Sequence, residues 1–403
     1  MFIFILLIVI LCFELWLTYL NYSYRHQPIP EYIQDIYDQS SYDSWQKYNH
    51  QRVVFSTIVG VVDTFITIIF LFMLASPWMN IVVNTTDNLI LQTLLFLGLY
   101  ALINWVISLI TSAYSTFVIE KRFGFNQSTL QTFISDKIKG LILLILVGGL
   151  LLSSILYLYL TFDRAFIIYS WIVLVCFILI INILYTKVFI KLFNKLTPLE
   201  ENELKEAIET FAVSVDFPIQ SIYVMDASKR STKVNAFFSG FGKFKDIILY
   251  DTLIEKLETD EIVAVLAHEI GHAKHKDVFK NMLLSVVTLM VFLIIFSWLT
   301  SYTNYLSAFG MPTSALGFQI LIFIILTHPI SIILDALFSN LSQRKEYRAD
   351  AYAKKYGYKK ALITALKKLS RENYANLTPH PLVVKLRYSH PPIKERVSAL
   401  LKN

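Results

Sequence analysis

The chain has 403 residues, of which 55% are hydrophobic and only 16% are charged. Soluble globular proteins carry about 25% charged residues, so this composition excludes an ordinary water-soluble domain and predicts a membrane protein. The net charge of +6 is the excess expected when Lys and Arg gather in the cytoplasmic loops of such a protein. Because no nucleic-acid-binding motif accompanies this charge, we expect no nucleic-acid partner.

Apolar runs long enough to cross a bilayer, about 20 residues each, occur seven times along the chain. The expected membrane helices are 2–20, 54–76, 89–112, 140–161, 166–188, 279–300 and 315–338. The first run has no basic leader and no small-residue cleavage site after it, which favours a retained helix over a signal peptide. Only residues 161–164 separate the fourth run from the fifth, so these two should form a tight helical hairpin.

The connections between these runs differ in their basic residues. Lys and Arg occur in 21–53, 113–139, 189–278 and 339–403, whereas 77–88 and 301–314 contain neither. Basic connections stay in the cytoplasm. We therefore expect the N-terminus outside, and the polar segments and the C-terminus in the cytoplasm.

The hydropathy pattern divides the chain into four parts. They are membrane helices with loops in 1–192, a polar segment in 193–277, two membrane helices in 278–338, and a helical C-terminal segment in 339–403. Neither polar part is large enough for a domain of its own, so the two should pack together.

Secondary structure in the first polar segment is mixed. Its pattern predicts a helix over 200–213 and short strands at 219–225, 236–238 and 247–250, hence a small α+β unit. Ionisable residues within the membrane runs are costly in lipid and favour a polar interior between the helices. These residues are Glu14, Asp63, His328 and Asp335.

The motif His268-Glu269-Ile270-Gly271-His272 lies in a stretch that predicts a helix over 260–274. Helical spacing puts His268 and His272 on one face, a single turn apart, where both imidazoles can reach one Zn²⁺. Glu269 lies about 100° further round the helix, beside the position of a metal-bound water. We expect Glu269 to act as the general base.

A catalytic zinc needs a third protein ligand and keeps a fourth position open. Glu346, just beyond the last membrane run, is the candidate, and Asp350 shares its helical face four residues on. Asp350 can then hydrogen-bond the outer nitrogen of a liganding histidine and fix its orientation. The prediction is one Zn²⁺ per chain, bound by His268, His272 and Glu346.

Two alternatives remain for this motif. A pair of histidines at this spacing also arises on surface helices without a metal. A helical membrane receptor or transporter with a structural zinc is the non-enzymatic reading. Against it, the ligand set has no fourth protein ligand, which structural zinc sites require, and Glu269 would have no purpose.

Several stretches resemble the type I CAAX prenyl endopeptidases, membrane-embedded zinc proteases of the gluzincin kind. They are 117–126, 233–242, the histidine helix with its continuation to Asp277, the Glu346-to-Asp350 box, and 388–396. The resemblance implies a mainly α, polytopic fold: seven membrane helices around a water-filled chamber, with a cytoplasmic α+β metalloprotease domain. The heat-shock membrane protease HtpX shares the zinc and Asn-Ala-Phe motifs, but is shorter and has fewer membrane helices.

The resemblance also implies roles that spacing alone does not assign. His390 would stabilise the oxyanion of the tetrahedral intermediate, and Arg396 would bind substrate or brace the site. The Asn235 segment would be an edge strand that pairs with the substrate backbone, a known mode of peptide capture.

The function expected from these features is hydrolysis of peptide bonds by a membrane zinc metalloendopeptidase. By resemblance it would remove the last three residues after a prenylated cysteine of a peptide or protein substrate. The alternative is a quality-control protease like HtpX that cuts misfolded polypeptides without prenyl recognition. The host membrane would be the cytoplasmic membrane of a prokaryote or the endoplasmic reticulum of a eukaryote.

Overall fold

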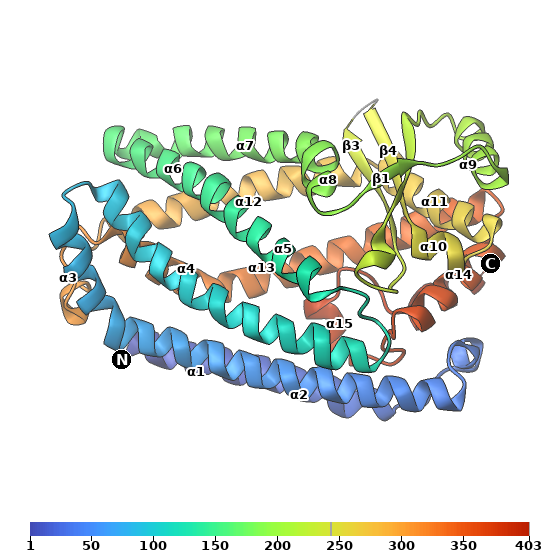
Figure 1. Cartoon of the computed structure of the whole chain (residues 1–403), viewed down its shortest axis with the longest axis horizontal. Helices are drawn as coiled ribbons and strands as arrows, with labels where there is room; N and C mark the ends of the chain where they lie inside the picture. Colours follow the sequence, from blue (N-terminus) through green and yellow to red (C-terminus); the bar gives the residue numbers. More distant parts are fainter. Residues whose placement is uncertain (242–243, 403) are drawn as a thin grey trace.

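The computed structural model describes residues 1–241 and 244–402 of the chain. Long helices run lengthwise through the molecule, and a small sheet with shorter helices forms one end (Figure 1). The longer helices are α1 (Phe2–Ser23), α2 (Gln39–Ile69), α3 (Ala75–Thr85), α4 (Leu89–Tyr114), α5 (Leu130–Leu143), α6 (Gly149–Thr161), α7 (Phe166–Leu184), α12 (Asp277–Thr300) and α13 (Leu316–Lys355). Short π-helical segments continue four of them: Phe70–Leu74, Ser115–Glu120, Leu144–Gly148 and Tyr185–Ile190.

Within the described residues, seven helical stretches are long and apolar enough to cross a membrane. They are Phe2–His26, Gln39–Thr85, Leu89–Glu120, Leu130–Thr161, Asp163–Phe193, Asp277–Thr300 and Leu316–Lys355. Each overlaps one predicted run, so the predicted polytopic helical fold is confirmed. The predicted hairpin forms too: the 3₁₀ turn Asp163–Ala165 joins α6 to α7, and the two helices pack together.

Burial within these stretches is low, between 6% and 22% of residues in each apolar window. A solid seven-helix bundle would bury more, so most of these side chains face surroundings other than protein. This agrees with the predicted arrangement of helices around an open interior. The connections rich in Lys and Arg lie at the end of the molecule that carries the sheet, and the N-terminus lies at the other end (Figure 1).

The polar segments form the end of the molecule that carries the sheet. Its strands, in spatial order, are β1 (Leu196–Pro198), β2 (Ser221–Met225), β4 (Phe244–Tyr250) and β3 (Ala236–Phe241). β2 and β4 are parallel, and β1 and β3 each pair antiparallel with a neighbour, which leaves both at an edge. The three predicted strands are present. β1 was not predicted, and its Pro198 is compatible with the strand because an edge strand tolerates proline.

Short helices complete this unit around a common apolar core. They are α8 (Lys191–Phe193), α9 (Glu203–Ser214), α10 (Asp251–Lys256), α11 (Thr259–Lys274), α14 (Lys359–Glu372), α15 (Pro381–Arg387) and α16 (Ile393–Leu401). α11 is the central helix and contacts α9, α13 and α14. The core also includes Ile33, Ile36 and Trp45, from the connection between α1 and α2 and the start of α2.

One helix joins the membrane part to the polar part. α13 continues for 40 residues from the last membrane run into the C-terminal segment, with Pro329 inside it. Glu346 therefore lies on the same continuous helix as the last membrane span.

Candidate active site

The histidine pair lies on α11, which the sequence stabilises locally and globally. The side chains of Glu258 and Glu261 form a capping box at its N-terminus, which satisfies free backbone N–H groups there. Ten of its residues are buried, His268 among them. This burial rules out the alternative of two surface histidines, because α11 is a core helix.

Glycine at 271 lets α11 and α13 approach closely. A Cβ atom at Gly271 would lie 3.0 Å from Ala349 Cα and 3.1 Å from Tyr352 Cβ. Since the first neighbour is backbone, it cannot move without shifting the helix. The glycine in the motif thus sets the distance between the histidine helix and the helix that carries Glu346.

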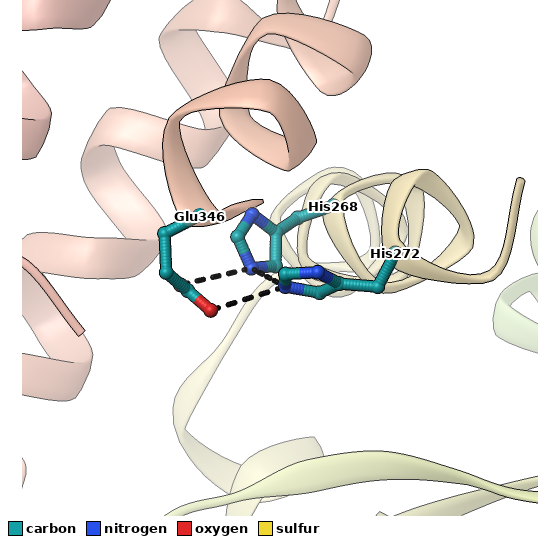
Figure 2. Close-up of side chains that lie close together, drawn as sticks. All are labelled: His268, His272 and Glu346. Atoms are coloured by element: carbon teal, nitrogen blue, oxygen red, sulfur yellow. Dashed lines mark hydrogen bonds and ion pairs between the residues drawn. The ribbon is translucent and has the colours of Figure 1, made fainter. Parts of the chain in front are cut away.

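His268, His272 and Glu346 converge on one point (Figure 2). The two Nε2 atoms are 3.2 Å apart. Glu346 Oε1 lies 3.1 Å from His272 Nε2, and Glu346 Oε2 lies 3.4 Å from His268 Nε2. Residues from two helices, 74 or more positions apart in the chain, therefore present three ligand atoms to a common centre.

These distances fit a tetrahedral metal ion. Metal–ligand bonds of about 2.0–2.1 Å at tetrahedral angles separate the ligand atoms by about 3.3 Å. The Glu346 carboxylate is buried at 2% exposure. A buried carboxylate that faces two imidazole Nε2 atoms is suited to bind a cation, and a metal ion supplies it.

The outer nitrogen of each histidine contacts a carboxylate. His268 Nδ1 lies 2.8 Å from Asp350 Oδ1, and His272 Nδ1 lies 3.1 Å from Asp277 Oδ2. Because ionised carboxylates only accept hydrogen bonds, each Nδ1 donates, which leaves Nε2 free to bind a metal. The structure thus brings Asp350 to the position expected for it.

Asp277 is a partner that the sequence analysis missed. It follows Lys276, whose backbone is left-handed (φ 56°), and begins α12. This turn brings the carboxylate back beside His272, five residues earlier, and Arg348 Nη2 fixes it with a 3.0 Å hydrogen bond. One signal in the sequence could have identified Asp277 as a partner of His272. It is an acidic residue five positions after the second histidine, in a stretch that resembles the protease family.

Arg396 lies behind the site. Its Nε and Nη2 atoms donate to the two oxygens of Asp350 at 2.9 and 2.6 Å, a bidentate pair. Nη1 is 3.6 Å from Glu346 Oε2, and the side chain is only 12% exposed. Of the two roles that the resemblance allows, this geometry favours bracing over substrate binding.

His390 lies on the open side of the site. Its Nδ1 is 2.9 Å from Glu346 Oε2, while 65% of the side chain is exposed. Pro391 and Pro392 follow it and stiffen the turn into α16. The ring therefore combines a fixed position beside a ligand carboxylate with access to an incoming molecule.

Glu269 is half-buried and next to His268 on α11. Its negative charge acts on both His272 and Arg396, so it faces the site. In residues 1–241 and 244–402 it makes no hydrogen bond or ion pair that would occupy its carboxylate. It is free to accept a proton.

The carboxylates around His268 and His272 raise the pKa of both imidazoles in the protein without a metal. Burial alone would lower the pKa of His272, but Glu346 and Asp277 outweigh it and raise the pKa to about 9. Burial and Arg396 likewise oppose charge on His268, yet hydrogen bonds to Asp350 and Glu346 raise its pKa. The site therefore attracts positive charge strongly.

Asn235 lies where the edge strand β3 begins. Its side-chain oxygen accepts from Ala236 N at 2.9 Å, and β3 contacts α11. Asn373 from the opposite segment holds the preceding residue: it exchanges hydrogen bonds of 3.0 and 3.1 Å with Val234 N and O. The strand is thus fixed near the histidine helix with one edge unpaired in the sheet. Gly242, at the end of the predicted segment, lies outside the described residues.

Comparison with known protein families gives two adjoining matches. Residues 18–195 match the family described as CAAX prenyl protease N-terminal, five membrane helices. Residues 198–403 match peptidase family M48. Together they cover the chain almost from end to end.

Curated relatives and a solved structure agree with this. The chain is 34% identical to CAAX prenyl protease 1 of Saccharomyces cerevisiae, over 96% of this chain and 92% of that protein. It is 32% identical to the CAAX prenyl protease 1 homolog of Homo sapiens, over 96% and 92%. The crystal structure of S. mikatae Ste24p is similar with a TM-score of 0.93 and 31% identity, covering 99% of this chain and 98% of that one.

Proposed function

Because this chain belongs to peptidase family M48 and is a membrane metalloendopeptidase, we propose that its metal is zinc, bound by His268, His272 and Glu346. The observation that carries this proposal is the convergence of two Nε2 atoms and the buried Glu346 carboxylate on one point. Two imidazoles and one carboxylate with an open fourth position are the ligand set of catalytic zinc. Elemental analysis of the purified protein, with Glu346→Ala as control, tests the metal's identity.

When bound, zinc supplies Lewis acidity, which polarises a peptide carbonyl and makes water easier to deprotonate. Glu269 takes a proton from the attacking water at its free carboxylate and passes it to the nitrogen of the leaving amine. His390 donates a hydrogen bond to the oxygen that becomes negative as the carbonyl is attacked. Asp350 and Asp277 hold the histidine rings, and Arg396 holds Asp350.

Replacing Glu269 by Gln tests the general base. The amide keeps the size of the side chain but cannot accept the proton, so activity should fall by about 10²–10⁴-fold. Bound metal should stay at the wild-type level, because Glu269 is not a ligand. Wild-type turnover by pure, metal-loaded Glu269→Gln protein would refute the assignment.

We further propose that the substrate is a peptide ending in the three residues that follow a prenylated cysteine. The support is the full-length likeness to proteins named CAAX prenyl protease 1. The Asn235 segment, as an edge strand beside α11, is suited to pair with the substrate backbone. Orientation follows the basic connections, with the site on the cytoplasmic side and the N-terminus outside.

Cleavage of a farnesylated peptide compared with its unmodified twin tests the substrate. A strong preference for the farnesylated form supports the proposal. Equal rates for both peptides favour the quality-control alternative, in which the enzyme accepts polypeptides without a lipid.

A further inference from the structure

A pocket of about 390 Å³ lies beside the metal-ligand site, between α12, α13 and α15. Its lining includes the direct neighbours of two site residues, Lys345 before Glu346 and Ser389 before His390. Asn281, also in the lining, is one helical turn (about 6 Å) beyond Asp277. The pocket thus adjoins the metal-ligand site through neighbouring residues on α12, α13 and the segment that carries His390.

Lys345 is the unusual residue in this pocket, because its charge is buried without a counter-ion. The residue is 8% exposed, and its Nζ donates a hydrogen bond to Asn281 Oδ1. Among the residues that the structure describes, no carboxylate lies within 4.0 Å of this ammonium group. An ammonium has three donors, so the amide of Asn281 leaves two of them for another partner.

The carboxylates nearby are already engaged or lie at the far end. Asp277 acts on Lys345 only through space, while it contacts His272 and Arg348. Asp335, in the same pocket, is ten residues earlier on α13, about 15 Å along the helix. The end of the pocket next to the metal ligands is therefore cationic and lacks an anion.

The other cation of the pocket is neutralised. Arg387 on α15 forms an ion pair with Glu14 on α1, which accounts for one of the ionisable residues in the membrane runs. Lys345 alone keeps a free charge, and buried charges are normally paired. A ligand that brings a carboxylate would complete this group.

We propose that this pocket binds the free carboxylate at the substrate's C-terminus, with the Lys345 ammonium as its partner. The inference rests on the proposed peptidase function. A leaving peptide of two or three extended residues spans about 7–11 Å, and Lys345 directly precedes the ligand Glu346 on α13. Hydroxyl groups of Ser339 and Ser389 line the same space. Recognition of the chain end would explain how a peptidase removes a short C-terminal piece.

Paired prenylated peptides that differ only at the C-terminus, free acid against primary amide, test the proposal. We expect wild-type protein to favour the acid by about 10- to 100-fold in kcat/KM, the range for hydrogen bonds to a charged group. Lys345→Gln should bring this ratio close to one. Lys345→Arg, which keeps a cation, should retain most of the preference.

Lys280→Gln is the matched control. Lys280 is exposed and adjacent to Asn281 in sequence, but it is outside the pocket lining. The Lys280→Gln variant loses the same charge as Lys345→Gln but should keep the full preference for the acid. Equal kcat/KM for the acid and the amide in wild type would overturn the carboxylate site. An unchanged acid-to-amide ratio in folded Lys345→Gln would overturn it as well. In both cases the proposed peptidase function would still hold, because the peptides are cleaved. Absence of metal-dependent cleavage of every peptide would instead overturn the proposed function itself.

Product inhibition gives a second measurement that needs no variant. The free tripeptide acid should inhibit wild-type cleavage at a concentration at least about tenfold below that of its amide. Equal inhibition by the two tripeptides would contradict a carboxylate site, whether or not Lys345→Gln folds.

Discussion

The two histidines of the motif are supported by very different parts of the molecule. The first group, here called the His268 arm, consists of His268, Asp350 and Arg396. In it, His268 is nearly enclosed, Asp350 is 3% exposed, and Arg396 donates two hydrogen bonds to the Asp350 carboxylate. The second group, here called the His272 arm, consists of His272, Asp277 and Arg348. In it, the His272 side chain is 20% exposed, and Arg348, which hydrogen-bonds Asp277, is 43% exposed. One arm sets the geometry in a rigid interior, and the other borders the solvent-accessible side.

The difference teaches that equal ligands in a motif need not have equal support. A hydrogen-bonded pair in a buried, low-dielectric setting is strong and costly to break, whereas water weakens interactions of partly exposed groups such as His272 and Arg348. We therefore expect changes on the His268 arm to weaken metal binding more than matching changes on the His272 arm.

The largest effect should come from removing the ligand that both arms share. Glu346→Ala takes away the carboxylate that lies near both Nε2 atoms, so metal affinity should fall by more than the roughly 100-fold typical of outer partners. Metal content after dialysis and peptidase activity measure this loss. Stoichiometric metal in the purified variant would show that the site is built differently.

The comparison is tested most directly by Asp350→Asn and Asp277→Asn. Loss of a carboxylate behind a liganding histidine costs about 10–100-fold in metal affinity. Asp350→Asn should lie at the upper end, because it also removes the bidentate partner of the buried Arg396 and leaves Glu346, 3.6 Å from Nη1, as its ion pair. Asp277→Asn should lie near the lower end. Competition with a chelator measures both, and equal losses would remove the distinction between the arms.

Proton release on metal binding gives a third test, because the pKa values of His272 and His268 are both raised. Below a pH of about 9, His272 of the metal-free protein carries an extra proton, because its pKa is raised to about 9. Metal binding must displace this proton, so affinity should rise with pH, by about tenfold per unit for one proton, and level off above 9 for this group. Calorimetry at pH 7.5 in buffers of different ionisation enthalpy counts the protons. No release at that pH would contradict the raised pKa.

The smallest effect is expected from Arg348→Gln. The Arg348 side of the ion pair with Asp277 is exposed, and pairs open to solvent contribute about 0.2–1 kcal/mol, at most about fivefold in affinity. Arg396→Gln is the matched change on the other arm and should cost more, because it strips a buried carboxylate of its partner. A larger metal loss for Arg348→Gln than for Arg396→Gln would reverse the proposed ranking.

Much of the fold was predictable because its signals are periodic. Seven apolar runs gave seven membrane-spanning stretches, and helical spacing of four residues brought His268 with His272 and Glu346 with Asp350. These arguments need only the rise and twist of one helix. The carboxylate on a separate helix was predictable because an open zinc site demands a third ligand.

The remaining features depend on turns and long-range contacts that no period encodes. Asp277 reaches His272 only because Lys276 adopts a left-handed conformation that its residue type does not favour. Asn373 meets Val234 from 139 residues away, and Lys345 looks in sequence like one of many cations. Neither contact leaves a local pattern in the chain.

The continuity of α13 makes the metal-ligand site sensitive to the lipid around it. Pro329 lies 17 residues before Glu346, about 26 Å along the helix. A bend of one degree at such a pivot would swing the carboxylate by about 0.4–0.5 Å, more than the roughly 0.2 Å that metal–ligand distances tolerate. The tight seam at Gly271 pins the ligand-bearing end, so a thicker or thinner bilayer should tilt the other half of the helix.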